Sequence, residues 1–148
     1  MLPILEKLKK NKIHKIKLGI FDVDGVMRGK YINMKKFESA LEKGFGFCDV
    51  VFGWDTADEL YDQPTVTGWH TGFPDAPAKI DVGTFRKIPW EPCTALFIAD
   101  FEYPDGRPYP ACPRQLCKTV LHKAGAMGYK VKSAFEYEFF LFDETPHT

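Results

Sequence analysis

The amino-acid sequence predicts an α+β protein with a small mixed or antiparallel sheet. The first third of the chain carries strand, hairpin, strand, helix and strand signals in that order. The middle third shows no helical periodicity, whereas a doubly wound parallel sheet would need repeated strand–helix units there. With 148 residues, of which 45% are hydrophobic and 15% aromatic, the chain is long enough to form a globular core.

The N-terminal elements are a short helix and a β-hairpin. Residues 2–10 have an amphipathic helical pattern, and residues 16–23 read as an apolar strand. Asp24-Gly25 is a strong hairpin turn signal, so residues 26–32 would form the returning strand.

A second helix with clear end signals follows the hairpin. Asn33 can cap its N-terminus, and Gly44 can close its C-terminus. The apolar positions are spaced by three and four, as on one helix face, and they are Met34, Phe37 and Leu41. Residues 47–54 then read as the third strand.

Residues 55–87 are interrupted by proline and glycine and show no long periodicity. We expect a long structured loop there, with one short strand near residues 79–82. Long ordered loops in small domains are often functional. Residues 95–103 read as the next strand, and Asp105-Gly106 as a second turn.

The C-terminal part of the chain predicts a helix and an extended segment. Pro113 fits the first turn of a helix that runs to about residue 127 and stops at Gly128. Residues 130–142 would form a final extended segment. The inward face of the helix would consist of Leu116, Val120, Leu121 and Ala124.

Charge and cysteine content narrow the classes of function. Lys plus Arg and Asp plus Glu both number 20, and no apolar run approaches the roughly 20 residues of a membrane span. We therefore expect neither a nucleic acid nor a membrane as a partner. Cys112, Cys117 and His122 would scatter around a helix instead of converging on a metal. The four cysteines are expected to be free thiols in a reducing cytoplasm.

The stretch LGIFDVDGVM contains two aspartates at the end of an apolar strand. It resembles the nucleophile motif of the haloacid-dehalogenase-like phosphatases. There Asp22 would attack the phosphoryl group, Asp24 would protonate the leaving oxygen, and Mg²⁺ would neutralise charge. The family's second motif should lead from an apolar strand into a helix, and residues 65–68 lack that context. A turn also accounts for Asp24-Gly25, so the phosphatase stands as an alternative.

The segment EYEFFLF places Glu136 and Glu138 two positions apart among aromatic residues. On a strand, alternate side chains share a face, so both carboxylates would point the same way. Two adjacent carboxylates repel each other, and a hard divalent cation relieves that repulsion. A strand edge with two solvated glutamates is the other interpretation.

Several segments in order resemble the glutamine synthetase family over nearly the whole chain. DVDGVMRGKYI is similar to its N-terminal hairpin, and IPWEPCTALFIADFEYPDGRPYPACPRQLCKTVLHKAGAMGY is similar to its linker. EYEFFLFDE resembles the EPEFFLF strand that opens its catalytic barrel. The resemblance implies an N-terminal helix in residues 1–15, a β-grasp domain in residues 16–104 with a functional loop at 55–87, and the start of a truncated catalytic domain in residues 105–148. It also implies an N-terminal fragment that is inactive by itself.

The resemblance further implies an ATP-dependent ligase of glutamine biosynthesis and nitrogen metabolism. Such an enzyme joins ammonia or another amine to the γ-carboxylate of glutamate. ATP phosphorylates the carboxylate, the amine displaces phosphate, and Mg²⁺ or Mn²⁺ stabilises charge. Glu136 would bind the metal on the phosphate side, and Glu138 the metal on the glutamate side. The full-length protein would be a ring-shaped homo-oligomer, a dodecamer.

One more site residue follows from a family loop in which Asp-Gly-Ser-Ser precedes Gly-Trp. Its aspartate reaches into a neighbouring subunit's site and helps to bind and deprotonate ammonium. Asp62 has the same spacing to the Gly-Trp pair at 68–69, although Gly-Ser-Ser is missing, and Asp55 and Asp58 are fallbacks. The amine could be ammonium, a polyamine or another primary amine. A turn-forming aspartate beside a proline is the other interpretation.

A third class of function also stands as an alternative. The chain could be a non-catalytic glutamine-synthetase-like module that acts only in assembly. Further Glu, His and Arg site motifs in the parent protein would separate the ligase from this alternative.

Overall fold

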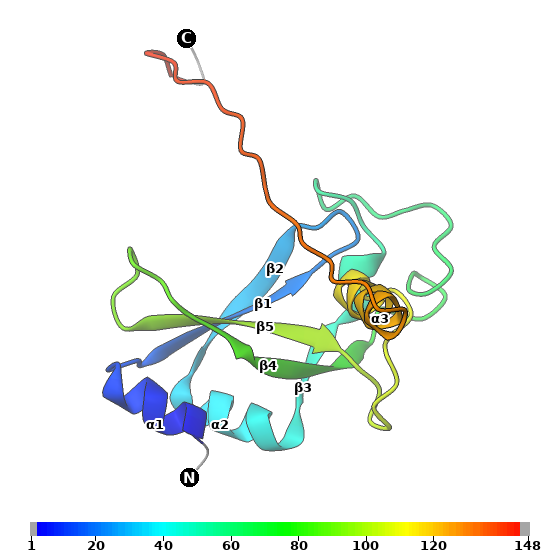
Figure 1. Ribbon diagram of the computed structural model, residues 1–148. Coiled ribbons are helices and arrows are strands. Elements are labelled where there is room, and N and C mark those ends of the chain that lie inside the picture. Colours follow the sequence, from blue (N-terminus) through cyan, green and yellow to red (C-terminus); the bar gives the residue numbers. More distant parts are fainter. Residues whose placement is uncertain (1–2, 146–148) are drawn as a thin grey trace.

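The computed structural model describes residues 3–145, which form a curled five-stranded sheet and three α-helices (Figure 1). The predicted α+β class is confirmed. The strands are β1 (Lys15–Phe21), β2 (Met27–Asn33), β3 (Phe45–Cys48), β4 (Asp75–Lys87) and β5 (Thr94–Phe101). The helices are α1 (Pro3–Lys10), α2 (Met34–Lys43), α3 (Pro113–Ala126) and the short 3₁₀ helix η1 (Asp49–Phe52). Leu2, where the first helix was expected to begin, lies outside the described residues.

The sheet is mixed, with strand order β2-β1-β5-β4-β3. β1 pairs with β2 in antiparallel register and with β5 in parallel register, where Leu18 stands opposite Phe97. β4 runs antiparallel to both β5 and β3. The central strand β5 therefore joins the N-terminal hairpin to the β3–β4 pair.

The hairpin and the caps of α2 follow the sequence signals. Gly25 has a φ of 79°, which a hairpin turn requires, and Asp22 N–H donates to the Val26 carbonyl across 3.1 Å. The Asn33 side chain accepts a 2.8 Å hydrogen bond from the Lys36 backbone N–H, and Gly44 ends the helix with a φ of 68°.

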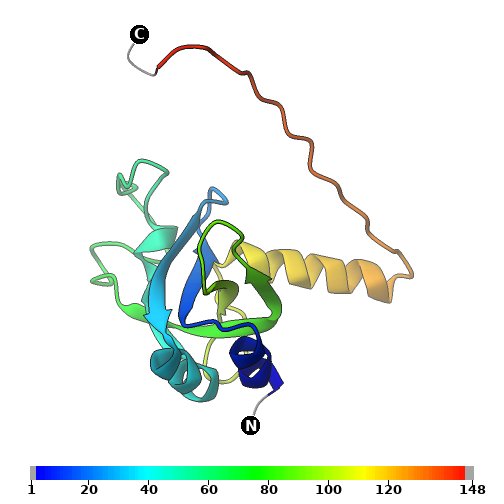
Figure 2. The same ribbon diagram turned by 90° about the vertical axis from the view of Figure 1, so that its left-hand side faces the viewer.

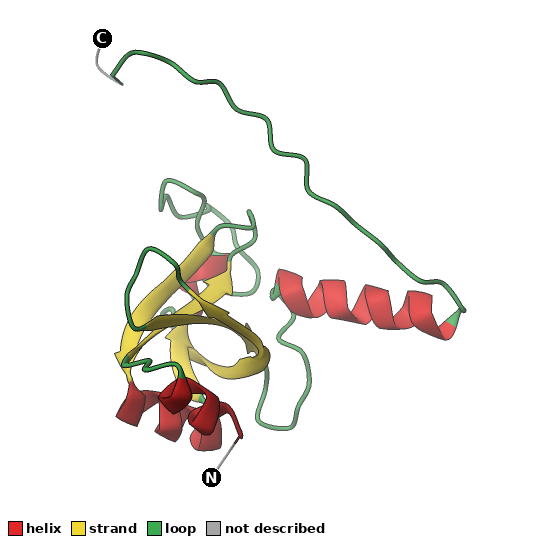
Figure 3. Ribbon diagram, turned by 60° about the vertical axis from the view of Figure 1, so that its left-hand side comes forward, coloured by secondary structure: helices red, strands yellow, loops and turns green. Residues whose placement is uncertain are grey.

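The hydrophobic core lies between α1, α2 and one face of the sheet (Figure 3). Alternate residues of β5, including Phe97 and Phe101, are fully buried on this face. The ring of Phe37 from α2 lies 4.8 Å from that of Phe97, and the ring of Phe52 from η1 lies 4.8 Å from that of Phe101. The ring of Tyr109, which lies 5.7 Å from that of Phe52, extends this core to the segment that precedes α3.

Two expectations for the middle of the chain were wrong. The third strand is shorter than residues 47–54, because the chain turns into η1 after Cys48. The long loop ends at residue 74, since residues 75–87 form the long strand β4 instead of one short strand. Strand β4 alternates buried and exposed residues from Asp75 to Ile80. A register shift between Asp81 and Arg86 interrupts this alternation, which is the sequence signal of a strand.

Helix α3 projects away from the sheet, and the chain continues from its far end as an extended segment (Figure 2). Its bounds and its stop at Gly128 match the prediction, but its apolar side chains do not point inward. Leu116, Val120 and Leu121 are 65%, 56% and 45% exposed. The helix contacts the sheet near its N-terminus through polar side chains instead.

None of the helices found between residues 3 and 145 is long and apolar enough to cross a membrane.

Candidate functional site

Glu136 and Glu138 lie on the extended segment after α3, and both side chains are exposed. Within residues 3–145 this segment pairs with no strand. The rings of Phe135 and Tyr137 lie 6.3 Å apart between centroids, as side chains two positions apart do on an extended backbone. By the same alternation Glu136 and Glu138 share the other side of the chain.

This pair of carboxylates suits a divalent metal as part of a ligand set. Carboxylate oxygens are the hard donors that Mg²⁺ and Mn²⁺ prefer. In the part of the chain that the structure describes, no group of three or more His, Cys, Asp or Glu side chains could hold a metal ion. A complete octahedral site has about six oxygen ligands, so Glu136 and Glu138 would supply a minority of them.

Asp62 lies in the loop between η1 and β4, and its side chain is exposed. No hydrogen bond or ion pair joins it to Glu136, to Glu138 or to any other residue in the range 3–145. The fallback residues differ from it in this respect. Asp55 accepts hydrogen bonds from the backbone N–H groups of Ala57 and Glu59, and Asp58 is ion-paired with Arg28.

The carboxylate of Asp22 is used inside the hairpin. Its side chain is fully buried, and Oδ1 accepts the backbone N–H groups of Asp24 and Val26. Oδ2 accepts a 2.8 Å hydrogen bond from Nε of Arg28, and this bond raises the pKa of the guanidinium above its usual range. Asp24, the other aspartate of the phosphatase alternative, is exposed.

A second buried carboxylate, Asp49, holds the far end of the Asp62 loop. It is 2% exposed; Oδ1 accepts a 2.5 Å hydrogen bond from the Thr67 hydroxyl, and Oδ2 accepts a 2.8 Å bond from the Tyr109 hydroxyl. Burial first, and then the bond to Asp49, raise the pKa of Tyr109 well above its usual range. The network joins η1, the loop and the segment before α3.

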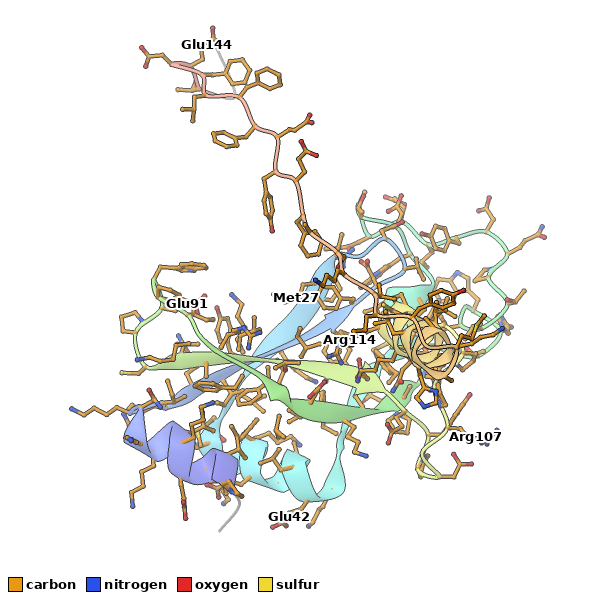
Figure 4. The ribbon with its side chains drawn as sticks, viewed as in Figure 1. Met27, Glu42, Glu91, Arg107, Arg114 and Glu144 are labelled. Atoms are coloured by element: carbon orange, nitrogen blue, oxygen red, sulfur yellow. The ribbon has the colours of Figure 1, made fainter. Side chains whose placement is uncertain are left out.

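A third polar cluster fixes the N-terminal turns of α3 to the sheet (Figure 4). Arg114 donates from Nη1 to Asp100 across 2.5 Å and from Nη2 to Asp81 across 2.8 Å. Lys118, one turn later, is also hydrogen-bonded to Asp100. These hydrogen bonds explain why α3 stays attached although its apolar residues are exposed.

Sequence reasoning found none of these three clusters. In the sequence, Thr67 belongs to a stretch that resembles a phosphatase motif, and Arg28 to a stretch that resembles the family hairpin. A buried ion pair leaves no periodic pattern, so pairing Asp22 with Arg28 or Asp49 with Tyr109 required the fold.

Comparison with known proteins gives consistent matches. The model of the glutamine synthetase catalytic domain matches residues 110–148. The type-1 glutamine synthetase 2 of Dictyostelium discoideum is 43% identical over 95% of this chain, which corresponds to 27% of that protein. The glutamate–isopropylamine ligase of a Pseudomonas species is 36% identical over 98% of this chain and 32% of its own length. The γ-glutamylethanolamide synthetase of Streptomyces coelicolor is 30% identical over 90% of this chain and 29% of its own length.

A solved structure, a GmaS/ADP complex, has the same fold with a TM-score of 0.65 at 24% identity, over 86% of this chain and 26% of the other. The chain thus spans about a quarter to a third of the length of the relatives that it matches. These matches confirm the predicted resemblance: nearly the whole chain is similar to part of a glutamine synthetase and of γ-glutamyl-amine ligases.

Proposed function

We propose that this chain forms part of an ATP-dependent ligase that joins ammonia or an amine to the γ-carboxylate of glutamate. The observation that carries the proposal is the near-complete alignment of the chain with a glutamine synthetase and with a glutamate–isopropylamine ligase. The family-model match from residue 110 onward includes Glu136 and Glu138, which are free to take a ligand from outside the chain.

Each candidate residue has a role that its surroundings support. Glu136 and Glu138 would be ligands of Mg²⁺ or Mn²⁺, Glu136 on the phosphate side and Glu138 on the glutamate side. The metal supplies positive charge that stabilises phosphoryl transfer from ATP. Asp62 would bind the ammonium or amine and take its proton in a neighbouring subunit's site, since an exposed and unpaired carboxylate can reach outside its own domain.

The amine remains the open part of the proposal. The names of the matched relatives include a glutamine synthetase, an isopropylamine ligase, an ethanolamide synthetase and an anilide synthase. The missing Gly-Ser-Ser after Asp62 favours an acceptor other than ammonium, because that loop lies beside the amine in the proposed site.

The assembled state is also part of the proposal. A site that takes Asp62 from a neighbouring subunit requires a homo-oligomer, and the family resemblance favours a cytoplasmic, ring-shaped dodecamer. The mass of the ligase containing this chain, measured by light scattering, would correspond to many subunits. A monomer with full activity would contradict the shared site.

The test is an activity assay of the ligase that contains this chain. Glutamate, Mg-ATP and one amine at a time would be incubated with it, over ammonium, isopropylamine, ethanolamine, aniline and a diamine. The expected result is one γ-glutamyl amide, identified by mass spectrometry, with one phosphate released per amide. No amide with any amine, from a protein that binds ATP and Mg²⁺, would reject the proposed function.

A further inference from the structure

The segment that carries Asp62 is held at both ends by side chains of other elements. One end, at residues 54–61, contacts the N-terminal hairpin, and the other, at Thr67, contacts Asp49. The residues between the two ends are half-buried or exposed. The contacts at the first end bear on the reaction only if Asp62 has the role proposed above.

Arg28 holds the first end with every part of its guanidinium. Nε donates to Asp22, Nη1 to Oδ1 of Asp58 across 2.6 Å, and Nη2 to the backbone carbonyl of Asp55 across 3.0 Å. The guanidinium carbon also lies 5.3 Å from the centre of the Trp54 ring. One side chain on β2 therefore contacts the loop through a carboxylate, a carbonyl and an aromatic face.

The loop segment that Arg28 grips is rigid in itself. Oδ1 of Asp55 accepts the backbone N–H groups of Ala57 and Glu59, and Asp55 N–H donates to the Glu59 carbonyl across 3.0 Å. Tyr61 N–H donates to the Gly53 carbonyl across 2.9 Å, which closes the turn directly before Asp62. A shift of this turn relative to the hairpin would therefore move Asp62 with it.

The segment after Asp62 is as closely packed as the turn before it. A Cβ atom on Gly68 would lie 2.7 Å from Cγ of Pro64, so a residue with a side chain could not allow this approach. Thr67 next to it is fully buried and bonded to Asp49. The backbone around Asp62 therefore runs from the turn that Arg28 holds to the buried Thr67, and the Asp62 side chain itself is exposed.

Arginine suits this position, and lysine does not. The guanidinium presents separate donors in one plane, so it can serve Asp22, Asp58 and the Asp55 carbonyl at once. A lysine would keep the positive charge beside the buried Asp22 but would lose the planar fork. Its single ammonium would hold the hairpin and release the loop.

We propose that Arg28 is a positioning residue for the reaction: it sets the place of Asp62 by clamping the turn at 54–61 to the hairpin. Arg28 touches neither amine nor ATP. Its effect is transmitted to the amine site through Asp62, and glutamate and ATP binding do not depend on it.

The test uses the assembled ligase that contains this chain and compares KM values for the amine, glutamate and ATP. We expect Asp62→Asn to raise the amine KM at least roughly tenfold, and Arg28→Lys to raise it about threefold to tenfold, with the other two KM values unchanged. Because Arg28 acts through Asp62, the double variant should be no worse than Asp62→Asn alone, which is the signature of coupled residues.

Glu91→Gln is the matched control. The Glu91 side chain is 19% exposed, as is that of Arg28, and it lies in the turn between β4 and β5 (Figure 4). It carries an ion pair with Lys17 and a hydrogen bond from Tyr31, and neither contact involves the loop that carries Asp62. This variant should leave all three KM values unchanged. Arg28→Lys retains the positive charge beside the buried Asp22, so we expect this variant to fold.

The outcomes separate the two claims. If amide still forms and the amine KM of Arg28→Lys equals that of the wild type, the positioning role is overturned and the ligase proposal stands. Additive effects on the amine KM in the double variant would have the same consequence. A normal amine KM in Asp62→Asn would overturn both the role of Asp62 and the positioning role, while amide formation still stands. An equal rise of all KM values in Arg28→Lys would indicate general loosening of the fold and would also overturn the inference.

Discussion

Nε of Arg28 and Oδ2 of Asp22 lie 2.8 Å apart and join the two strands of the N-terminal hairpin through a fully buried carboxylate. The other oxygen of Asp22 accepts two backbone N–H groups of the turn. Both oxygens are therefore used inside the fold. A phosphoryl-transfer nucleophile needs an oxygen that a substrate can reach, so this geometry favours a structural role for Asp22.

The first prediction is that Asp22→Ala destabilises the fold. Removing a buried carboxylate leaves the guanidinium and two backbone N–H groups without their acceptor, and we expect a loss of about 3 kcal/mol in the free energy of unfolding. Urea denaturation followed by circular dichroism measures it. Asp24→Ala, in the same turn but exposed, should stay within about 0.5 kcal/mol of the wild type. Equal effects of the two substitutions would contradict the structural role.

The second prediction concerns Asp49 and Tyr109. Tyr109→Phe keeps the ring stacked on Phe52 but removes the hydroxyl that donates to Asp49. The carboxylate keeps its bond from Thr67 and loses the other, so we expect a loss of about 1–3 kcal/mol in unfolding free energy. Tyr103→Phe is the control, because the Tyr103 hydroxyl makes no hydrogen bond in the described part of the chain. A Tyr109→Phe protein as stable as Tyr103→Phe would contradict this.

The raised pKa of Tyr109 adds a pH signature to that prediction. A group whose pKa is higher in the folded state stabilises the fold at pH values below its unfolded pKa, which for tyrosine is about 10. This stabilisation declines as the pH rises beyond that value. The wild type should therefore lose stability between about pH 9.5 and 11 more steeply than Tyr109→Phe. Parallel curves for the two proteins would show that Tyr109 does not titrate differently in the folded state.

The third prediction concerns the attachment of α3. The hydrogen bond from Arg114 is the main cause that lowers the pKa of Asp81, with partial burial opposing it. Because the pKa of Asp81 is lower in the folded state, its ion pair stabilises the fold at pH values above the pKa of an unfolded aspartate, which is about 3.9. This stabilisation is lost as the pH falls through the pKa of Asp81 in the folded state. Fluorescence of a dye at Cys117, which is exposed on α3, should report its release from the sheet below about pH 4.

Asp81→Asn is the matched variant for that experiment. It retains the shape of the side chain but removes the charge, so Arg114 keeps only Asp100 as an ionic partner. Release of α3 in this variant should begin at a higher pH or be present throughout. An identical pH profile in both proteins would show that Asp81 does not hold the helix.

Local signals sufficed for most elements of the fold. Gly25 and Gly44 adopt the positive φ that their turn and cap require, and Asn33 caps α2, because these features depend on neighbouring residues alone. β4 was missed because a register shift interrupts its alternation, and its pairing with β5 lies in distant sequence. Periodicity therefore locates an element reliably only where one face is buried without interruption.

In helix α3, by contrast, the periodicity of apolar residues located the helix correctly but predicted a buried face that is not there. Its apolar positions predicted a buried face, but Leu116 and Val120 are exposed in the described structure. Helical periodicity indicates that one face of a helix can be buried, but it does not indicate which surface covers that face. Similarly, strand alternation and the family resemblance single out Glu136 and Glu138, and the resemblance alone singles out Asp62. The contacts of Arg28 and Asp49 are visible only in the fold, because their partners lie elsewhere in the chain.

The fourth prediction is that the purified 148-residue chain has no ligase activity. Two carboxylates on an extended segment are too few to hold the metals, and Asp62 would serve a neighbouring site. Incubation with glutamate, Mg-ATP and the amine panel should release no amide. The same sample with Mg²⁺ and a generic phosphate ester should release no phosphate above the level of Asp22→Asn. Phosphate release that Asp22→Asn abolishes would support the phosphatase alternative, and amide formation would show that the chain suffices.

The fifth prediction tests the metal role in the assembled ligase. Glu138→Ala removes one of two adjacent carboxylates, and since a metal ligand contributes charge and geometry that water does not replace, activity should fall to the background level. The Mg²⁺ concentration needed for half-maximal ATP-dependent stabilisation against heat should rise at least tenfold, which corresponds to about 1.4 kcal/mol of lost binding. Glu144→Ala is the control, because Glu144 is an exposed carboxylate near the end of the same extended segment (Figure 4). Near-normal turnover in Glu138→Ala, or an equal loss in Glu144→Ala, would refute the assignment of Glu138 as a ligand.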